Sequence, residues 1–275
     1  MSLTNWSCPV CGGTLCADAQ SLRCENGHCY DRAKKGYVNL LRSNRSHDKR
    51  HGDDRAMVAA RTAFLEKGYY APLRAAIAET AVSRCPAAPT VLDVGCGEGY
   101  YTAAVHDALC AAGKTPDVYG VDISREALIA AHRRLPALSL AVATLSRLPM
   151  ADGRCDLMMN VFAPADAREF HRVLRPGGTL LRVVPLERHL WELKCAVYDV
   201  PYENQPPETE LEGFRLAERR DIVSRIALPD AADIEALFRM TPYYYKTSRA
   251  DQEKLARLQT LETETAFALL VYEKN

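Results

Sequence analysis

The chain has 275 residues, 48% of them hydrophobic, and its 35 basic and 35 acidic side chains give a formal net charge of zero. This length allows one large domain, or a large domain with a small appendage. The start of the chain lacks a signal-peptide core, and charges interrupt every apolar run well before the ~18 residues of a membrane span, so we expect a cytoplasmic protein that does not enter a membrane.

The N-terminal stretch CPVCGGTLCADAQSLRCENGH concentrates cysteine. Five of the ten thiols fall between residues 8 and 29, among too few large apolar residues to bury them. A C-x2-C pair and a C-x3-H pair, twelve residues apart, can each aim two ligands from a tight turn, and this ligand set suits tetrahedral zinc. The predicted ligands are Cys8, Cys11, Cys24 and His28. Cys29 is the alternative to His28, Cys16 is spare, and four protein ligands would make the zinc structural.

A basic segment follows the cysteines. Residues 31–55 hold eight Lys or Arg against four Asp. Such a segment is usually solvated, and contact with nucleic acid is the functional alternative. We therefore divide the chain into a zinc-binding module (1–36), a basic linker with a helix (37–69) and one large domain (70–275).

The large domain alternates strands and helices. Strands are expected in TVLDV, DVYGVD, LSLAVATL, CDLMMNVFAP and TLLRVVP, with helices between most of them, one capped by Ser124 and one ended by Pro-Gly-Gly. This alternation predicts an α/β fold with a parallel sheet covered on both faces. Ligands of such sheets bind beyond the carboxyl ends of the strands.

A glycine-rich turn follows the first of these strands. It reads G-x-G-x-G, with glycines Gly95, Gly97 and Gly99. Asp93 and Glu98 add carboxylates, which would repel a pyrophosphate but suit a ligand that carries an amino group and a sulfonium charge. Asp122 ends the second strand, where an acid can accept hydrogen bonds from two ribose hydroxyls.

The stretch VLDVGCGEG resembles the first motif of the Rossmann-like S-adenosylmethionine-dependent methyltransferases, and the resemblance covers residues 70–275. It implies a seven-stranded sheet with an antiparallel C-terminal hairpin formed by FRLAERRDIVSRIAL and TAFALLVYEK. It also implies that Gly95 to Gly99, including Cys96, hold the methionine part of the cofactor, that Asp122 holds the ribose and that Ala143 and Thr144 flank the adenine.

The ordered set of motifs along the chain resembles one family, the bacterial 23S ribosomal RNA guanine-N1 methyltransferases. These motifs are the finger, AKKGYVNLL, R-x-x-FL-x-x-G-x-Y-x-P, LD-x-GCGEGYYT, RHLWELK and MTP. The resemblance implies methylation at N1 of one guanosine in a 23S rRNA hairpin, zinc on the four predicted ligands, a homodimer, and cofactor contacts from Tyr70 and His189. The residues alone would make Tyr70 a half-buried core tyrosine and His189 an exposed surface or capping residue.

Asn160 ends the fourth strand, where enzymes of this kind place groups that face the substrate. It is the candidate to hold the guanine edge, against the alternative of a strand-end turn residue. No histidine or carboxylate stands out as the base. Tyr37 or the run Tyr243 to Tyr245 offers a stacking face for the base.

Two other functions stay open at this point. An S-adenosylmethionine-dependent methyltransferase could act on tRNA or a small metabolite, with zinc purely structural. A non-catalytic RNA-binding protein could keep a vestigial cofactor pocket, although the intact glycine turn and its carboxylates argue against that alternative.

Overall fold

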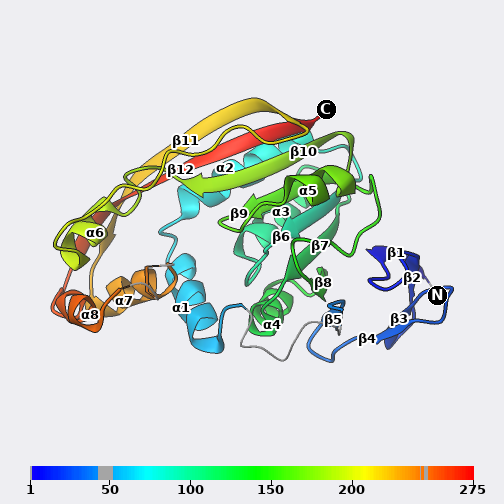
Figure 1. Ribbon diagram of the computed structural model, residues 1–275, viewed down its shortest axis with the longest axis horizontal. Helices are drawn as coiled ribbons and strands as arrows, with labels where there is room; N and C mark the ends of the chain where they lie inside the picture. Colours follow the sequence, from blue (N-terminus) through cyan, green and yellow to red (C-terminus); the bar gives the residue numbers. More distant parts are fainter. Residues whose placement is uncertain (1, 43–51, 242, 245–246) are drawn as a thin grey trace.

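The computed structural model describes residues 2–42, 52–241, 243–244 and 247–275. Residues 43–51 of the basic segment and Tyr245 lie outside the described residues. Within them, the chain forms an eight-stranded sheet with helices packed on it and a separate four-stranded sheet near the N-terminus (Figure 1).

The large sheet has the strand order β11-β12-β10-β9-β6-β7-β8-β5. Its strands are β5 (Tyr37–Asn39), β6 (Thr90–Val94), β7 (Asp117–Asp122), β8 (Ser139–Val142), β9 (Cys155–Val161), β10 (Leu174–Pro185), β11 (Phe214–Leu228) and β12 (Leu261–Lys274). All neighbours from β10 to β5 pair in parallel, whereas β12 runs antiparallel to both β10 and β11. The sequence therefore predicted the core strands and the antiparallel C-terminal pair correctly.

The expected count of seven strands is wrong, because the sheet has eight. The additional strand is β5, which we had assigned to the basic linker. Tyr37 and Val38 pair with Leu140 and Ala141 of β8, and Val38 is buried. Aromatic and β-branched residues suit this position at the edge of a half-buried sheet. A three-residue strand is too short for its periodicity to be recognised in the sequence.

The helices begin and end largely where their capping residues predict. They are α1 (Arg55–Glu66), α2 (Ala71–Arg84), α3 (Tyr100–Ala111), α4 (Arg125–Arg134), α5 (Ala167–Val173), α6 (Trp191–Val197), α7 (Ala231–Arg239) and α8 (Arg249–Leu255). Ser124 caps α4, since its hydroxyl accepts from the N–H of Ala127 at 3.2 Å. Helix α5 ends at Val173, just before the Arg-Pro-Gly-Gly stretch that disfavours helix.

Each face of the sheet has its own hydrophobic core. Met158 and Met159 are neighbours on β9, yet both are fully buried, one in each core. Helices α2, α3 and α4 contribute buried residues to one core, and α5 contributes to the other. Burial on both sides explains why β9 reads as a continuous apolar run rather than an alternating one.

The N-terminal module helps to cover the second face. Its strands are β1 (Ser2–Ser7), β2 (Thr14–Ala17), β3 (Ser21–Arg23) and β4 (Cys29–Asp31). Trp6, Leu15 and Leu22 are buried in the same core as α5. The Trp6 ring meets the Tyr119 ring edge-on, with centroids 4.8 Å apart. Residues 143–154, between β8 and β9, form no helix, so the module fills space that a crossover helix would otherwise cover.

Candidate cofactor, substrate and zinc sites

The four predicted zinc ligands come together in the N-terminal module. One ligand atom from each of Cys8, Cys11, Cys24 and His28 lies within 4.8 Å of the others. The Sγ atoms of Cys11 and Cys24 are 3.7 Å apart, close to the roughly 3.8 Å between two thiolates bound to one tetrahedral zinc ion. The donor set therefore fits zinc without rearrangement.

Two glycine turns shape this cluster. Gly12 follows the first pair with φ +77°, and Gly27 lies inside the second with φ +81°, conformations that favour glycine. Cys29 lies outside the cluster, exposed, with its thiol near Arg23 instead. The structure thus brings His28, and not Cys29, to the other three ligands.

The module contacts the sheet at the end opposite to the glycine turn. The Asn5 side-chain amide donates to Thr90 and Asp117, which begin β6 and β7. The glycine turn follows the last residue of β6, one strand length away. Six residues of strand span about 20 Å, so this anchor lies far from the turn.

The glycine turn at the carboxyl end of β6 requires its glycines. Gly95 and Gly97 have φ values of +83° and +54°. A Cβ atom on Gly95 would lie 2.6 Å from the Cβ of Ala163, so a side chain there would push the loop after β9 away. The N–H of Gly97 donates to Asp122 Oδ2 at 2.9 Å, which joins the ends of β6 and β7.

Asp93 is the carboxylate of the turn that lacks a cationic partner. It is 2% exposed, and Oδ2 accepts from the Thr102 hydroxyl at 2.6 Å, while Oδ1 is buried without a hydrogen bond. Burial, and to a smaller extent the nearby charges of Asp122 and Glu98, raise the pKa of Asp93 to about 7 despite the Thr102 bond. A bound cation would relieve this cost. This buried acid therefore fits the ammonium group of a ligand.

Glu98 is also buried, but Arg61 of α1 neutralises it. The Arg61 Nε donates to Glu98 Oε2 at 2.5 Å, and Nη1 pairs with Asp53. The electrostatic suitability for a cationic ligand therefore rests on Asp93 rather than on Glu98. The R-x-x-FL-x-x-G-x-Y-x-P motif contains Arg61, but the sequence alone did not indicate a role for this arginine.

Tyr70 and His189 lie close together although they are far apart in the sequence. Their ring centroids are 6.2 Å apart, and Phe267 of β12 packs against both, at 4.9 Å and 4.5 Å. Both side chains are buried, so the exposed surface role that composition favoured for His189, and the half-buried one for Tyr70, are wrong.

His189 is a neutral imidazole. Its Nδ1 accepts from the N–H of Ala266 at 3.2 Å, which places the remaining proton on Nε2. Burial, together with the charge of Lys194, lowers the pKa of His189 to about 3. The residue can donate one hydrogen bond and form part of an aromatic wall, but it is not placed to act as a base.

Asn160 is the penultimate residue of β9, and Phe162 directly follows the strand. Asn160 is fully buried; its Nδ2 donates to the carbonyl of Pro164 at 3.1 Å, and its Oδ1 has no hydrogen bond. Phe162 has φ +57° and is 45% exposed, with its ring 5.3 Å from Phe267 and 6.3 Å from Tyr101. An aromatic residue in this region costs about 1–2 kcal/mol, so the surrounding structure holds Phe162 there.

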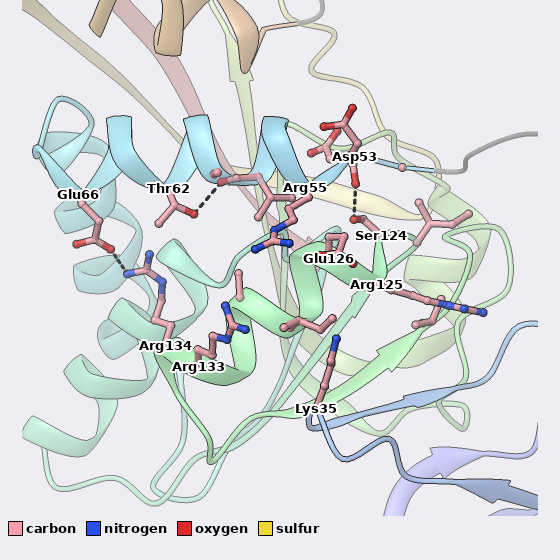
Figure 2. A pocket seen from close by; sticks show the side chains of 18 of the residues that line it. Lys35, Asp53, Arg55, Thr62, Glu66, Ser124, Arg125, Glu126, Arg133 and Arg134 are labelled. Carbon is pink, nitrogen blue, oxygen red and sulfur yellow. Dashed lines mark hydrogen bonds and ion pairs between the residues drawn. The ribbon is translucent and has the colours of Figure 1, made fainter. Parts of the chain in front are cut away.

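A groove of about 1200 Å³ lies between α1 and α4 (Figure 2). Its charged lining residues are Lys35, Arg55, Arg125, Arg133 and Arg134 with Asp53, Asp54, Glu66 and Glu126. The charges nearly balance, and Arg134 pairs with Glu66 at 2.5 Å. At one end the Ser124 hydroxyl donates to the carbonyl of Asp53, so residues 52–54 cross the end of β7 beside Asp122. The groove is not a simple basic channel.

The proposed tyrosine stacking faces are partly covered. Tyr37 and Tyr243 are half-buried against the main core, and the Tyr243 hydroxyl donates to Asn204 at 3.1 Å. The exposed aromatic beside the glycine turn is Phe162. Sequence reasoning missed it because a single phenylalanine after a strand carries no periodic signal, although the NVFAP stretch was visible.

Two family models match the chain. One, described as RlmA, N-terminal, is a zinc ribbon and matches residues 6–49; the other, described as a methyltransferase domain, matches residues 91–178. A 23S rRNA (guanine(748)-N(1))-methyltransferase of Streptomyces fradiae is 43% identical over 195 residues, which are 69% of this chain and 66% of the relative. YxjB of Bacillus subtilis, provisionally named as a 23S rRNA (guanine-N1)-methyltransferase, is 32% identical over 93% of this chain and 91% of the relative. The chain belongs to this family.

Membership of the 23S rRNA (guanine-N1)-methyltransferase family makes the protein an enzyme that uses S-adenosylmethionine and carries zinc in its N-terminal module. YcgJ of Bacillus subtilis, a solved structure, is 17% identical over 74% of this chain and 97% of its own, with a TM-score of 0.50, and shows the shared fold. No helix in the described part of the chain combines the length and apolarity needed to cross a bilayer.

Proposed function

We propose that this protein transfers the methyl group of S-adenosylmethionine to N1 of one guanosine in a hairpin of 23S rRNA. The observation that carries the proposal is the match to YxjB along 93% of the chain, which includes both the zinc module and the cofactor edge of the sheet. Neither the tRNA alternative nor the metabolite alternative accounts for a relationship of that extent. Because the Streptomyces fradiae relative is named for guanine 748, we propose the same nucleotide as the target.

The cofactor binds at the carboxyl ends of β6 and β7 in this proposal. S-adenosylmethionine supplies an electrophilic methyl group on a sulfonium. Asp93 faces the ammonium group, the backbone from Gly95 to Gly99, including Cys96, lies against the methionine part, and Asp122 accepts from the ribose hydroxyls. Tyr70 and His189 close the pocket, and Ala143 and Thr144 flank the adenine.

Guanine N1 is buried in any base pair, so the enzyme must take an unpaired base or extrude one, at a cost of a few kcal/mol. The exposed Phe162 ring offers a face on which that base stacks, worth about 1–3 kcal/mol. The unpartnered Oδ1 of Asn160 is an acceptor for a guanine N–H. Most of the acceleration then comes from in-line positioning of N1, methyl carbon and sulfur, and the proton that N1 carries is released to water.

The role of Asn160 can be separated from its support of the loop. Asn160→Asp keeps an acceptor oxygen but loses the donor to Pro164, whereas Asn160→Ala loses both. We expect the alanine variant to lower kcat more than the aspartate variant does. An unchanged rate for Asn160→Ala would refute the assignment.

We propose a homodimer in the cytoplasm, with the division into residues 1–36, 37–69 and 70–275 amended by β5, which joins the large sheet. Light scattering on the purified protein tests the dimer.

The test of the function is a transfer assay with labelled S-adenosylmethionine and protein-free 23S rRNA, 16S rRNA or tRNA. We expect label on 23S rRNA alone, and reverse-transcription mapping should place it at N1 of one guanosine. Label on tRNA alone would refute the rRNA assignment. Label on no RNA, with cofactor bound, would point to a small substrate.

A further inference from the structure

Arg61 is the member of the R-x-x-FL-x-x-G-x-Y-x-P motif that core packing does not explain. Phe64, Leu65 and Tyr70 are buried in the main core, and Tyr70 is also a proposed cofactor contact. Arg61 lies on α1, before the first strand of the catalytic domain, yet its guanidinium reaches the glycine turn after β6 and is 22% exposed. Packing in the hydrophobic core therefore does not explain why an arginine is held at this position.

The guanidinium is only partly used by the protein. Nε donates to Glu98 and Nη1 to Asp53. Nη2 makes no hydrogen bond to a described residue, and it is the nearest atom to the open side of Gly97, 3.1 Å from where a Cβ would stand. The two acids hold the planar group in place and leave one nitrogen directed at the turn.

Although its charge is paired with Glu98 and Asp53, Arg61 still offers an N–H donor at the turn, opposite to the acceptor that Asp93 offers. Asp93 Oδ1 is a buried acceptor without a partner, and Arg61 Nη2 is a donor without one. An α-amino acid carries the matching pair, an ammonium and a carboxylate, and the methionine part of S-adenosylmethionine is an α-amino acid. Arginine binds carboxylates through directed, charge-assisted hydrogen bonds.

We propose that Arg61 binds the carboxylate of the cofactor's methionine part while Asp93 faces its ammonium group. The inference rests on the proposed cofactor site and adds a residue to it from outside the glycine motif. It also explains why Gly97 has no side chain, since a Cβ would occupy the space in front of Nη2.

The competing explanation is that Arg61 only neutralises Glu98 and ties α1 to the turn. Both explanations predict weaker binding of S-adenosylmethionine by Arg61→Ala, so affinity for that compound alone decides nothing. They differ for decarboxylated S-adenosylmethionine, which keeps the amine, sulfonium and adenosine but lacks the carboxylate.

The experiment measures the Kd of both compounds by calorimetry on the zinc-loaded full chain. We expect the wild type to prefer S-adenosylmethionine by about 10- to 100-fold, as for one charge-assisted contact. Arg61→Ala should bind the two compounds within about threefold of each other. Arg61→Lys keeps the charge but loses the planar guanidinium, so it should show an intermediate preference. It replaces the alanine variant in the test if that variant does not fold.

Two matched controls isolate the carboxylate contact. Glu98→Gln removes the negative charge beside Arg61 but keeps an oxygen that accepts from its Nε, and Arg134→Ala removes an arginine that binds the Glu98 carbonyl at 3.1 Å; both should keep the wild-type preference. A preference that survives in Arg61→Ala, or that Glu98→Gln abolishes equally, would overturn the proposal. A wild type that binds S-adenosylmethionine but does not discriminate would overturn it as well and leave the proposed function intact. Failure of the wild type to bind either compound would overturn the cofactor site itself.

Discussion

The zinc cluster and the cofactor pocket are built in opposite ways. The cluster takes all its ligands from residues 8–28 and depends on two local turns. The proposed cofactor pocket collects Arg61, Asp93, Asp122 and His189 from separate elements that are spread over nearly half of the chain. Local spacing specifies the first, whereas the order of strands in the sheet specifies the second, where Asp93 keeps a buried oxygen without a hydrogen-bond partner.

Removal of zinc should have the largest effect. It tests whether the N-terminal module depends on its metal for stability. Cys24→Ser should unfold residues 2–36, since structural zinc contributes on the order of 10 kcal/mol to a module this small. Trp6 packs on Tyr119, so its fluorescence should shift to the red, and bound zinc should disappear in metal analysis.

Cys29→Ser is the matched control, because Cys29 is exposed next to His28 but outside the cluster. It should keep zinc and the wild-type emission. Cys24→Ser protein that retains one zinc per chain and a buried Trp6 would contradict the assigned ligand set.

Loss of the Asp93 carboxylate should have the next largest effect. The pKa of Asp93 is about 7, and a cationic ligand binds the ionised form, so binding of S-adenosylmethionine should release a proton and weaken about tenfold for each pH unit below 7. Asp93→Asn should lower affinity by roughly 10- to 100-fold at pH 8 and remove this dependence. Calorimetry from pH 5.5 to 8.5 measures both, and an unchanged slope in Asp93→Asn would assign the proton to another group.

His189 should affect stability in acid. Its pKa of about 3 in the folded state lies below the ordinary value near 6.5, so the unfolded chain binds more protons between these values, and stability falls as pH drops through that range. At pH 5 the loss relative to pH 7 should be about 2 kcal/mol. The difference in unfolding free energy between wild type and His189→Gln isolates this loss, because the opposite contribution of Asp93 cancels. A pH-independent difference would mean that His189 has the same pKa in the folded and unfolded states.

The difference between the two regions also explains what the sequence could predict. Spacing sufficed for the four zinc ligands, and the alternation of strands and helices sufficed for β6, β7 and the glycine turn. No local pattern indicates that Arg61 reaches Glu98 or that Tyr70 meets His189, since these contacts depend on how distant elements pack. Strand β5 was missed for a related reason: three residues become a strand only because β8 offers them an edge.

Substitution of Phe162 should have the smallest effect. It distinguishes contacts to the substrate from contacts to the cofactor. Phe162→Ala removes the exposed ring, so kcat/KM for 23S rRNA should fall about tenfold, at the lower end of the value of one stacked base. The Kd for S-adenosylmethionine should stay unchanged, because the contacts proposed for the cofactor lie elsewhere. Phe162→Tyr keeps the ring and is the control, with activity close to that of the wild type.

Phe162→Gly offers a further distinction, because glycine accepts a φ of +57° without strain and loses the same ring. If it matched Phe162→Ala in activity while unfolding at a higher temperature, the strained backbone would be a cost that the loop bears in order to present the ring. Equal loss of cofactor affinity in both variants would instead make Phe162 a part of the cofactor pocket.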